Sequence, residues 1–207
     1  SRGLGDVYKR QGVDGIMIVT PYYSKPSQHG ILRHFEEISK ITDLPIMAYN
    51  IPGRTSTLIE LETLQTLVDD IGIHSIKDAV GDFEFSKKQL ELLKDKVDIY
   101  SGNDNQTYDF VINGGVGVVS VASHVVGDEI SEMISFAKDN DLEKAEEINM
   151  QLSNLFEAIF EEPSPGPIKK ILSESWEEVG EPLLPITSIT PELANKIRGI
   201  YKKIKEN

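Results

Sequence analysis

The sequence has 207 residues, a net charge of −13 at pH 7 and no cysteine. This length is enough for one sizeable core, the lack of thiols excludes a disulfide framework or thiolate metal site, and the acidic balance argues against a nucleic-acid partner. No apolar run approaches the roughly 20 residues that span a bilayer, so we expect no membrane segment and a cytoplasmic protein. The four histidines lack the spacing of metal ligands, so we expect no metal site. They are His29, His34, His74 and His124.

The chain opens with a stretch that has no apolar period. Residues 1–11 mix glycine with charge, and we expect them to be non-native or unstructured. From Gly12 onward, short apolar runs alternate with helical patterns. The runs that we expect to form strands are residues 16–19, 45–49, 71–77, 97–100 and 118–121.

The helical patterns between these runs begin at residues suited to capping. Ser27, Thr57 and Asp82 are the expected N-cap residues, because their side-chain oxygens can accept hydrogen bonds from the first free N–H groups of a helix. A short helix is expected to end at Asn113-Gly114-Gly115.

The spacing of the apolar runs indicates the fold class. Ile46 lies 28 positions after Ile18, and Ile73 lies 27 positions after Ile46. A strand, a helix of about 11 residues and two loops need roughly this length. Continuous apolar strands are typical of a parallel sheet covered on both faces. We therefore predict an α/β fold over residues 12–139, either doubly wound or a (β/α)₈ barrel, and count five βα units.

After about residue 140 the pattern becomes helical throughout. A long amphipathic pattern covers residues 142–160, Pro167 can open a short helix, and Thr190 followed by Pro191 is a good helix start. We expect residues 140–207 to form a helical extension.

Lys77 ends one of the apolar runs, and this position is informative. Burying an ammonium group costs several kcal/mol unless its proton is lost. A lysine at the carboxyl end of a strand can lie in a dry pocket, lose its proton and attack a carbonyl. Taken alone, the stretch favours the alternative of an exposed lysine at a strand end.

Tyr49 and Arg54 change this weighing. Tyr49 ends the preceding strand, and the carboxyl ends of parallel strands form the ligand-binding edge of such sheets. A tyrosine beside an imine-forming lysine can shuttle protons, and an arginine can hold a substrate carboxylate. The alternatives are a strand-end tyrosine in water, a surface arginine and, for Tyr22 and Tyr23, core or interface aromatics.

Several motifs in this order resemble the dihydrodipicolinate synthase family of lysine-dependent class I lyases, which also includes N-acetylneuraminate lyase. The resemblance covers the chain from Gly12 to its carboxyl end. The motifs are Val-Thr-Pro-Tyr-Tyr at 19–23, Tyr-Asn-Ile-Pro-Gly-Arg-Thr at 49–55, Ile-Lys-Asp at 76–78 with Gly-Asp at 81–82, Ser-Gly-Asn-Asp at 101–104 and Gly-Gly-Val-Gly-Val-Val-Ser-Val at 114–121.

The resemblance implies a (β/α)₈ TIM barrel with a carboxyl-terminal helical domain. Residues 12–139 would supply strands 4–8 of the barrel. By the same resemblance, Lys77 is the Schiff-base lysine that captures pyruvate and Tyr49 is the proton donor and acceptor. Arg54 would bind the carboxylate of the aldehyde substrate.

Four further residues take roles from the resemblance alone. Tyr23 would reach across a tight dimer into the neighbouring active site, and Tyr22 would lie beside a lysine feedback site at that interface. Gly102 and Val119 match backbone positions that line the pyruvate pocket. The complete protein would be a homodimer or homotetramer that uses no cofactor.

The implied reaction is the condensation of pyruvate with L-aspartate-4-semialdehyde in lysine biosynthesis. Arg54 and Thr55 after the Tyr-Asn-Ile-Pro motif favour this 4-hydroxy-tetrahydrodipicolinate synthase activity over a sialic acid lyase. The alternatives are a related pyruvate-dependent aldolase, acting on N-acetylneuraminate or a sugar acid, and a non-catalytic barrel that binds a small acid.

One departure from the family is large. The amino-terminal strands that carry a Gly-Thr-Thr-Gly-Glu-type motif are absent, which corresponds to about three βα units. The missing threonines would bind the pyruvate carboxylate and complete the proton relay. We therefore expect weak or no turnover and poor solubility for residues 1–207 alone.

Overall fold

A computed structural model describes residues 12–206 of the chain. The expectation for residues 1–11 lies outside the described residues. The described part divides into two compact units. The first runs up to Asn103 and includes Asn113–Val119, and the second comprises Asp104–Ile112 and Ser120 onward.

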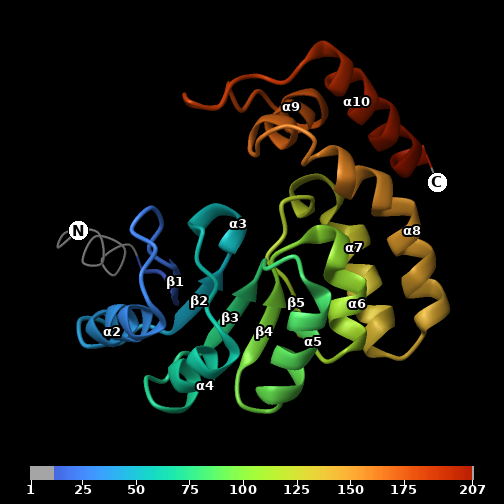
Figure 1. Cartoon of the computed structure of the whole chain (residues 1–207). Coiled ribbons are helices and arrows are strands. Elements are labelled where there is room, and N and C mark those ends of the chain that lie inside the picture. The colour runs from blue at the N-terminus through green and yellow to red at the C-terminus, as the bar shows by residue number, and fades with distance from the viewer. Residues whose placement is uncertain (1–11, 207) are drawn as a thin grey trace. The chain divides into compact units, whose positions relative to one another are not determined.

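The first unit is built on a parallel sheet in which each strand pairs with the next strand along the chain (Figure 1). All five predicted strands are present, and the predicted α/β fold is confirmed. Within residues 12–206, the first and last strands each pair on one side only. The strands are β1 (Ile16–Val19), β2 (Ile46–Asn50), β3 (Ser75–Asp78), β4 (Asp98–Ser101) and β5 (Gly117–Val118).

Helices follow the strands and bury the core of the first unit. Alternate strand residues point to the same face of a sheet, and one such set (Ala48, Ile76 and Ile99) is buried. Helix residues such as Phe35 and Leu64 are fully buried as well. The helices of this unit are α2 (Gln28–Ser39), α3 (Pro52–Thr55), α4 (Leu61–Asp69) and α5 (Phe83–Leu92).

Two of the three predicted caps are confirmed. The Ser27 hydroxyl accepts a hydrogen bond from a backbone N–H in the first turn of α2, and the Asp82 carboxylate accepts two such bonds at the start of α5. The Thr57 prediction is wrong, because α4 begins after Glu60. Thr57 instead lies in a turn where its carbonyl accepts the hydroxyl of Thr55.

The last strand is shorter than predicted. We expected it to cover residues 118–121, whereas β5 is Gly117–Val118. The physical reason is the buried carboxylate of Asp104, which accepts the Ser120 hydroxyl and the N–H groups of Val121 and Ala122. These N–H groups are turned away from the sheet ladder, and α7 begins directly afterwards.

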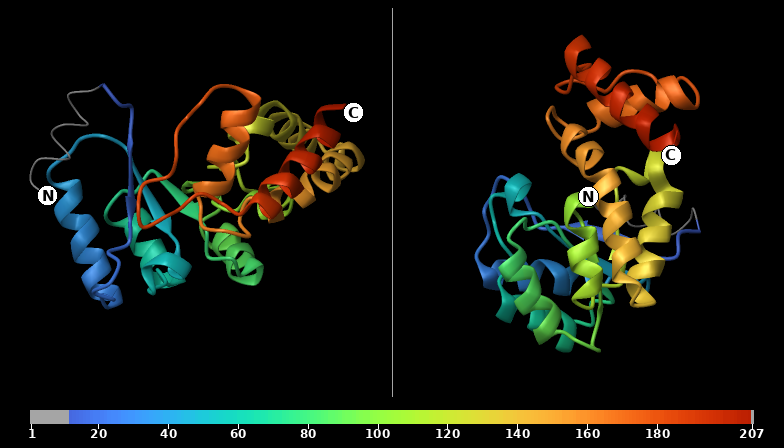
Figure 2. Two further views of the ribbon diagram at one scale, coloured as in Figure 1. Left: turned by 90° about the horizontal axis from the view of Figure 1, so that it is seen from above. Right: turned by 90° about the vertical axis from the view of Figure 1, so that its right-hand side faces the viewer.

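The second unit is helical. In Figure 2 α7 and α8 run side by side, and both contribute to a core around Met133, Ala137 and Ala145. Helix α10 contacts α8 and α9. The elements are η1 (Asp104–Gln106), α6 (Thr107–Ile112), α7 (Ser123–Lys138), α8 (Leu142–Ala158), α9 (Gly166–Ser175) and α10 (Pro191–Glu206).

The helical character of the carboxyl-terminal region is confirmed, but the compact units divide the chain differently from the predicted boundary between residues 139 and 140. Helix α7 precedes that boundary and nevertheless packs with α8 in the second unit. The assignment of residues 12–139 to strands 4–8 of a barrel stays a prediction. No helix within residues 12–206 is long and apolar enough to cross a membrane.

Candidate active site

Lys77 lies one residue before the end of β3 and is only 8% exposed. In the register of the sheet it stands between Tyr49 on β2 and Tyr100 on β4. Its position in an interior strand explains its burial, because strands pair with β3 on both sides. The structure therefore places the predicted nucleophile inside the first unit rather than at its surface.

Tyr49 is in direct contact with this lysine. The Lys77 Nζ lies 4.2 Å from the centroid of the Tyr49 ring. Burial raises the pKa of the Tyr49 hydroxyl above its usual value, and the positive charge of Arg54 partly offsets this rise. The hydroxyl is thus protonated at neutral pH, which is the state that a proton donor requires.

Gly102 forms a wall beside Lys77, and only glycine fits there. A Cβ atom at this position would lie 2.7 Å from the Cβ of Ala79 and 3.0 Å from the Cε of Lys77. The Gly102 N–H donates to the carbonyl of Asp78 at 2.5 Å, which draws the end of β4 onto the end of β3. A side chain here would displace the lysine or the backbone that carries it.

Arg54 belongs to the single-turn helix α3, directly after β2. Pro52 begins this helix, where its missing N–H costs nothing, and Arg54 is exposed. The turn that follows is fixed by Asn50, whose side chain exchanges two hydrogen bonds of 3.0 Å with the backbone of Ile59. The arginine is therefore carried by a well-anchored turn at the same edge of the sheet as Tyr49.

Val119 follows β5 and is half-buried. Its N–H donates to the carbonyl of Ser101 at 2.9 Å, which ties the ends of β4 and β5 together. Val119 and Gly102 thus lie next to each other's strand ends, as expected for residues that line one edge of a parallel sheet.

Tyr22 and Tyr23 are not brought to this cluster. They lie in the turn after β1 and are 70% and 95% exposed. Tyr23 has a φ of 68°, a left-handed conformation that is costly for a residue with a side chain. The described chain thus leaves both rings in solvent.

Asp78 is a residue of this site that the sequence analysis did not single out. It is only 2% exposed, and its carboxylate accepts hydrogen bonds from Val80, Ser86 and Gln89. Burial raises its pKa, and these three bonds partly offset the rise. The sequence carried one signal, because two polar residues of α5, Ser86 and Gln89, lie on the buried face of the helix beside Leu90.

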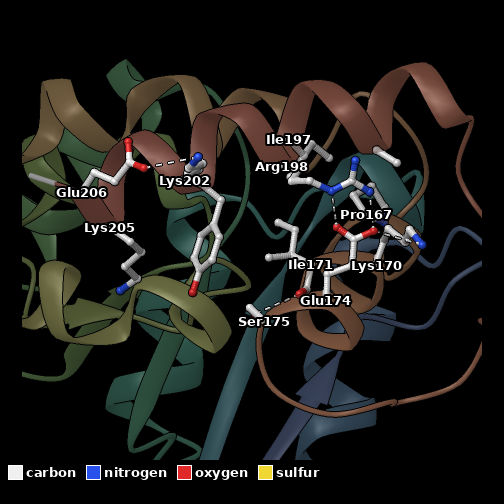
Figure 3. A pocket seen from close by; sticks show the side chains of 12 residues that line it. Pro167, Lys170, Ile171, Glu174, Ser175, Ile197, Arg198, Lys202, Lys205 and Glu206 are labelled. Carbon is white, nitrogen blue, oxygen red and sulfur yellow. Dashed lines mark hydrogen bonds and ion pairs between the residues drawn. The ribbon is translucent and has the colours of Figure 1, made fainter.

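A separate hollow lies within the second unit, between α9 and α10 (Figure 3). Its volume is about 580 Å³, and Ile171 and Ile197 contribute to its apolar lining. The charged groups at its rim pair with each other: Glu174 binds Arg198 and Lys170. It contains none of the predicted site residues.

The cluster around Lys77 combines a buried amine, a protonated phenol and a nearby guanidinium. An unprotonated amine forms an imine with a ketone or aldehyde, and the imine withdraws electrons from the adjacent carbon. The phenol can supply and accept the protons that these steps move. Within the described residues there is no group of acidic, histidine or cysteine side chains that could hold a metal ion.

The comparisons with known proteins agree on one family. Residues 2–204 match the Dihydrodipicolinate synthetase family. The 4-hydroxy-tetrahydrodipicolinate synthase of Listeria monocytogenes serotype 4b is 36% identical over 201 residues, which cover 97% of this chain and 69% of the relative. The 4-hydroxy-tetrahydrodipicolinate synthase 1 of Halalkalibacterium halodurans is 42% identical over 181 residues, which cover 87% of this chain and 61% of the relative.

A solved structure agrees with this likeness. The 4-hydroxy-tetrahydrodipicolinate synthase from the methanotroph Methylacidiphilum fumariolicum superposes with a TM-score of 0.94 at 34% identity, covering 99% of this chain and 68% of that chain. The present chain therefore spans 61–69% of the length of these relatives.

Proposed function

Because the chain belongs to the Dihydrodipicolinate synthetase family, we propose that it carries the imine-forming centre of a 4-hydroxy-tetrahydrodipicolinate synthase. In this proposal pyruvate forms an imine on Lys77 and then condenses with L-aspartate-4-semialdehyde. The observation that carries the proposal is the burial of Lys77 at 8% exposure with its Nζ 4.2 Å from the Tyr49 ring centroid.

The chemistry follows from the two side chains. The unprotonated Nζ of Lys77 attacks the ketone carbon of pyruvate, and loss of water leaves an imine. The imine accepts electrons when a methyl proton leaves, which gives an enamine. The enamine carbon then attacks the aldehyde carbon of the semialdehyde. Tyr49 is proposed to donate and accept the protons, and the raised pKa of its hydroxyl favours the donor form before reaction.

Arg54 is proposed to select the second substrate. An exposed guanidinium at the end of β2 can bind the carboxylate of the semialdehyde through two hydrogen bonds. The backbone of Gly102 and Val119 is proposed to line the pyruvate pocket. A sugar-acid aldolase is the second candidate, because the same lysine and tyrosine would serve it equally well.

Tyr22 and Tyr23 support a proposal about assembly. Two adjacent aromatic side chains that are 70% and 95% exposed are unusual for a surface without a partner. We propose that Tyr23 enters the active site of a neighbouring subunit in a homodimer or homotetramer and that Tyr22 lies beside a lysine-binding site at that interface. The cytoplasmic location expected from the sequence stays a prediction.

Trapping with borohydride tests the imine directly. The chain is incubated with pyruvate and borohydride, digested, and analysed by mass spectrometry for a reduced adduct. We expect the adduct on Lys77. Lys77→Met, which keeps the length of the side chain, is the matched control and should leave no adduct at this position. An adduct on another lysine, or none, contradicts the proposal.

A substrate comparison tests the role of Arg54. Changing Arg54 to Ala should weaken transition-state binding with the semialdehyde by about 2–4 kcal/mol, because a charge-assisted contact is lost. Adduct formation with pyruvate should be unchanged. Measurable and equal turnover of the semialdehyde and of N-acetylneuraminate would overturn the synthase assignment and favour the sugar-acid aldolase.

The level of turnover is a separate expectation. The sequence predicts weak or no condensation by residues 1–207 alone. The assay is therefore run beside the longer Listeria enzyme at equal concentration, so that imine formation and complete turnover are measured independently. Turnover equal to that of the longer enzyme would contradict this expectation.

A further inference from the structure

The carboxylate of Asp78 is held by three donors from the segment that follows β3. Its Oδ1 accepts the N–H of Val80 at 2.9 Å. Its Oδ2 accepts the Ser86 hydroxyl at 2.8 Å and the Gln89 amide at 3.1 Å. Ser86 and Gln89 are three residues apart on α5 and therefore lie on one face of the helix. The end of β3 is thus fixed to α5 through directional bonds.

The backbone around Asp78 is fixed as well. The Asp78 carbonyl accepts the N–H of Gly102, and the next N–H, that of Ala79, donates to the carbonyl of Asn50 at 2.9 Å. Lys77 is the residue immediately before Asp78. Because neighbouring strand residues point to opposite faces, the lysine projects from one face of the sheet while the carboxylate is anchored on the other.

If Asp78 served only to fill space in the core, an apolar side chain would do so at a lower cost in free energy. Burying an ionised group carries a penalty, and an apolar residue of similar volume is often neutral or stabilising at such a position. The groups that favour the ionised form of Asp78 are hydrogen-bond donors, not a cation. What the donors provide is a fixed direction, which apolar contact lacks.

The space around Lys77 makes direction important. The Cε of Lys77 would lie only 3.0 Å from a Cβ placed on Gly102, so the lysine side chain packs closely against Gly102, the wall of the site. A small rotation of the end of β3 would move the Nζ away from the Tyr49 ring or drive the lysine stem into this wall.

We propose that Asp78, held by Ser86 and Gln89, is a positioning residue that aims Lys77 at the ketone of its substrate. It acts through the backbone of β3 and does not touch the substrate. This inference rests on the proposed imine chemistry of Lys77 and adds residues to which neither the sequence motifs nor the resemblance assigned a role.

The test uses the full chain, pyruvate and borohydride, and measures the rate of adduct formation on Lys77 against pyruvate concentration. Asp78→Leu replaces the hydrogen-bonded carboxylate with an apolar side chain that can still fill the core. It should lower the limiting rate of adduct formation about tenfold or more, since a small misplacement of a nucleophile slows its reaction strongly. The pyruvate concentration at half-maximal rate should stay unchanged, because Asp78 does not touch pyruvate. Urea unfolding should show a cooperative transition.

Asp78→Asn should restore the rate to within about twofold. Its oxygen can accept from Val80, and its amide can donate to Ser86 and to the Oε1 of Gln89, which has no hydrogen-bond partner among residues 12–206. Gln89→Met, which leaves Asp78 in place, covers the case in which the leucine variant does not fold, and should slow the reaction by a smaller factor. Thr63→Val removes another buried hydroxyl of the same unit, on α4, and should leave the rate of adduct formation on Lys77 unchanged.

The outcomes separate the two proposals. Adduct formation at the parental rate in both Asp78→Leu and Gln89→Met overturns the positioning role and leaves the imine chemistry intact. An asparagine variant as slow as the leucine variant also overturns it, because direction would then not be what the carboxylate supplies. No adduct on Lys77 in the unsubstituted chain overturns the proposed function and this inference together.

Discussion

The ends of β1 and β2 lie side by side in the sheet, but the buried polar side chains at these ends differ in their hydrogen bonding. Thr20 and Asn50 follow the register pair Val19–Tyr49, and both are fully buried. The Asn50 side chain makes two hydrogen bonds with Ile59, whereas the Thr20 hydroxyl has no partner in the part of the chain that the structure describes. Within residues 12–206, side-chain hydrogen bonds thus satisfy the buried polar group at the end of β2, but not the one at the end of β1.

This difference separates the candidate site residues into two groups. The turn anchored by Asn50 carries Arg54 and follows Tyr49, and these positions are determined within one chain. The turn after Thr20 carries Tyr22 and Tyr23, and both rings lie in solvent. A role for the second group depends on a partner, while imine formation on Lys77 beside Tyr49 can be tested in this chain alone.

The largest effect on stability is expected from Asn50→Ala. It leaves the N–H and carbonyl of Ile59 buried without their partner, and we expect the free energy of unfolding to fall by about 2–4 kcal/mol. Urea unfolding measures this loss. A loss below about 1 kcal/mol would show that the turn is held by other contacts and that the contrast between the two strand ends is weaker than described.

Gly102→Ala tests whether the anchored side of the site is also tightly packed. The new Cβ would meet the Cβ of Ala79 at 2.7 Å, and we expect a destabilisation of about 1–3 kcal/mol together with slower adduct formation on Lys77. Gly199→Ala is the matched control. Gly199 lies within α10 with nothing within 4 Å of an added Cβ, so that substitution should stabilise by up to about 1 kcal/mol. Equal effects of the two substitutions would contradict tight packing beside Lys77.

Thr20→Val should act in the opposite direction to Asn50→Ala. It removes a buried hydroxyl that lacks a hydrogen bond and keeps the branched shape, so we expect a gain of about 1 kcal/mol in the free energy of unfolding. Denaturation in urea distinguishes the signs of the two effects. A loss of stability would mean that the hydroxyl is hydrogen-bonded in solution.

The smallest effect is expected at Tyr23. Asparagine tolerates a left-handed backbone better than tyrosine, and the 95% exposed ring contributes little packing, so Tyr23→Asn should gain roughly 0.5 kcal/mol. Tyr22→Asn, at a position without a left-handed φ, is the control and should be nearly neutral. If Tyr23 completes the active site of a neighbouring subunit, the corresponding substitution in a longer family member should lower its turnover, and an assay of that enzyme can show this. A destabilised Tyr23→Asn chain would indicate that the ring packs against something in solution.

The sequence was sufficient to predict the strands and the order of the helices, because apolar runs and helical periodicity are local signals. It was also sufficient to pair Lys77 with Tyr49, since parallel strands bring their carboxyl ends together. It failed at Thr57 and at residues 119–121, where Asn50 and Asp104 redirect the backbone through hydrogen bonds between distant residues. Such bonds leave no periodic trace in the sequence.

Asp78 shows the same limit within the site. A carboxylate after an apolar strand is typical of a loop, and only its contacts with Ser86 and Gln89 show that it is buried. The local sequence pattern also could not predict that Tyr22 and Tyr23 are exposed, because a tyrosine is found in cores, in interfaces and on surfaces.

The strand order of the sheet has a consequence for how the chain folds during synthesis. Each strand pairs with the one made just before it, and the order β1-β2-β3-β4-β5 skips no strand. Each new strand and its helix can therefore dock as soon as they leave the ribosome, without waiting for a distant partner, and the loops closed at each step are short. Tyr49 can therefore already be paired with β1 when the strand carrying Lys77 is made, so the proposed nucleophile would be added to a sheet edge that is already formed.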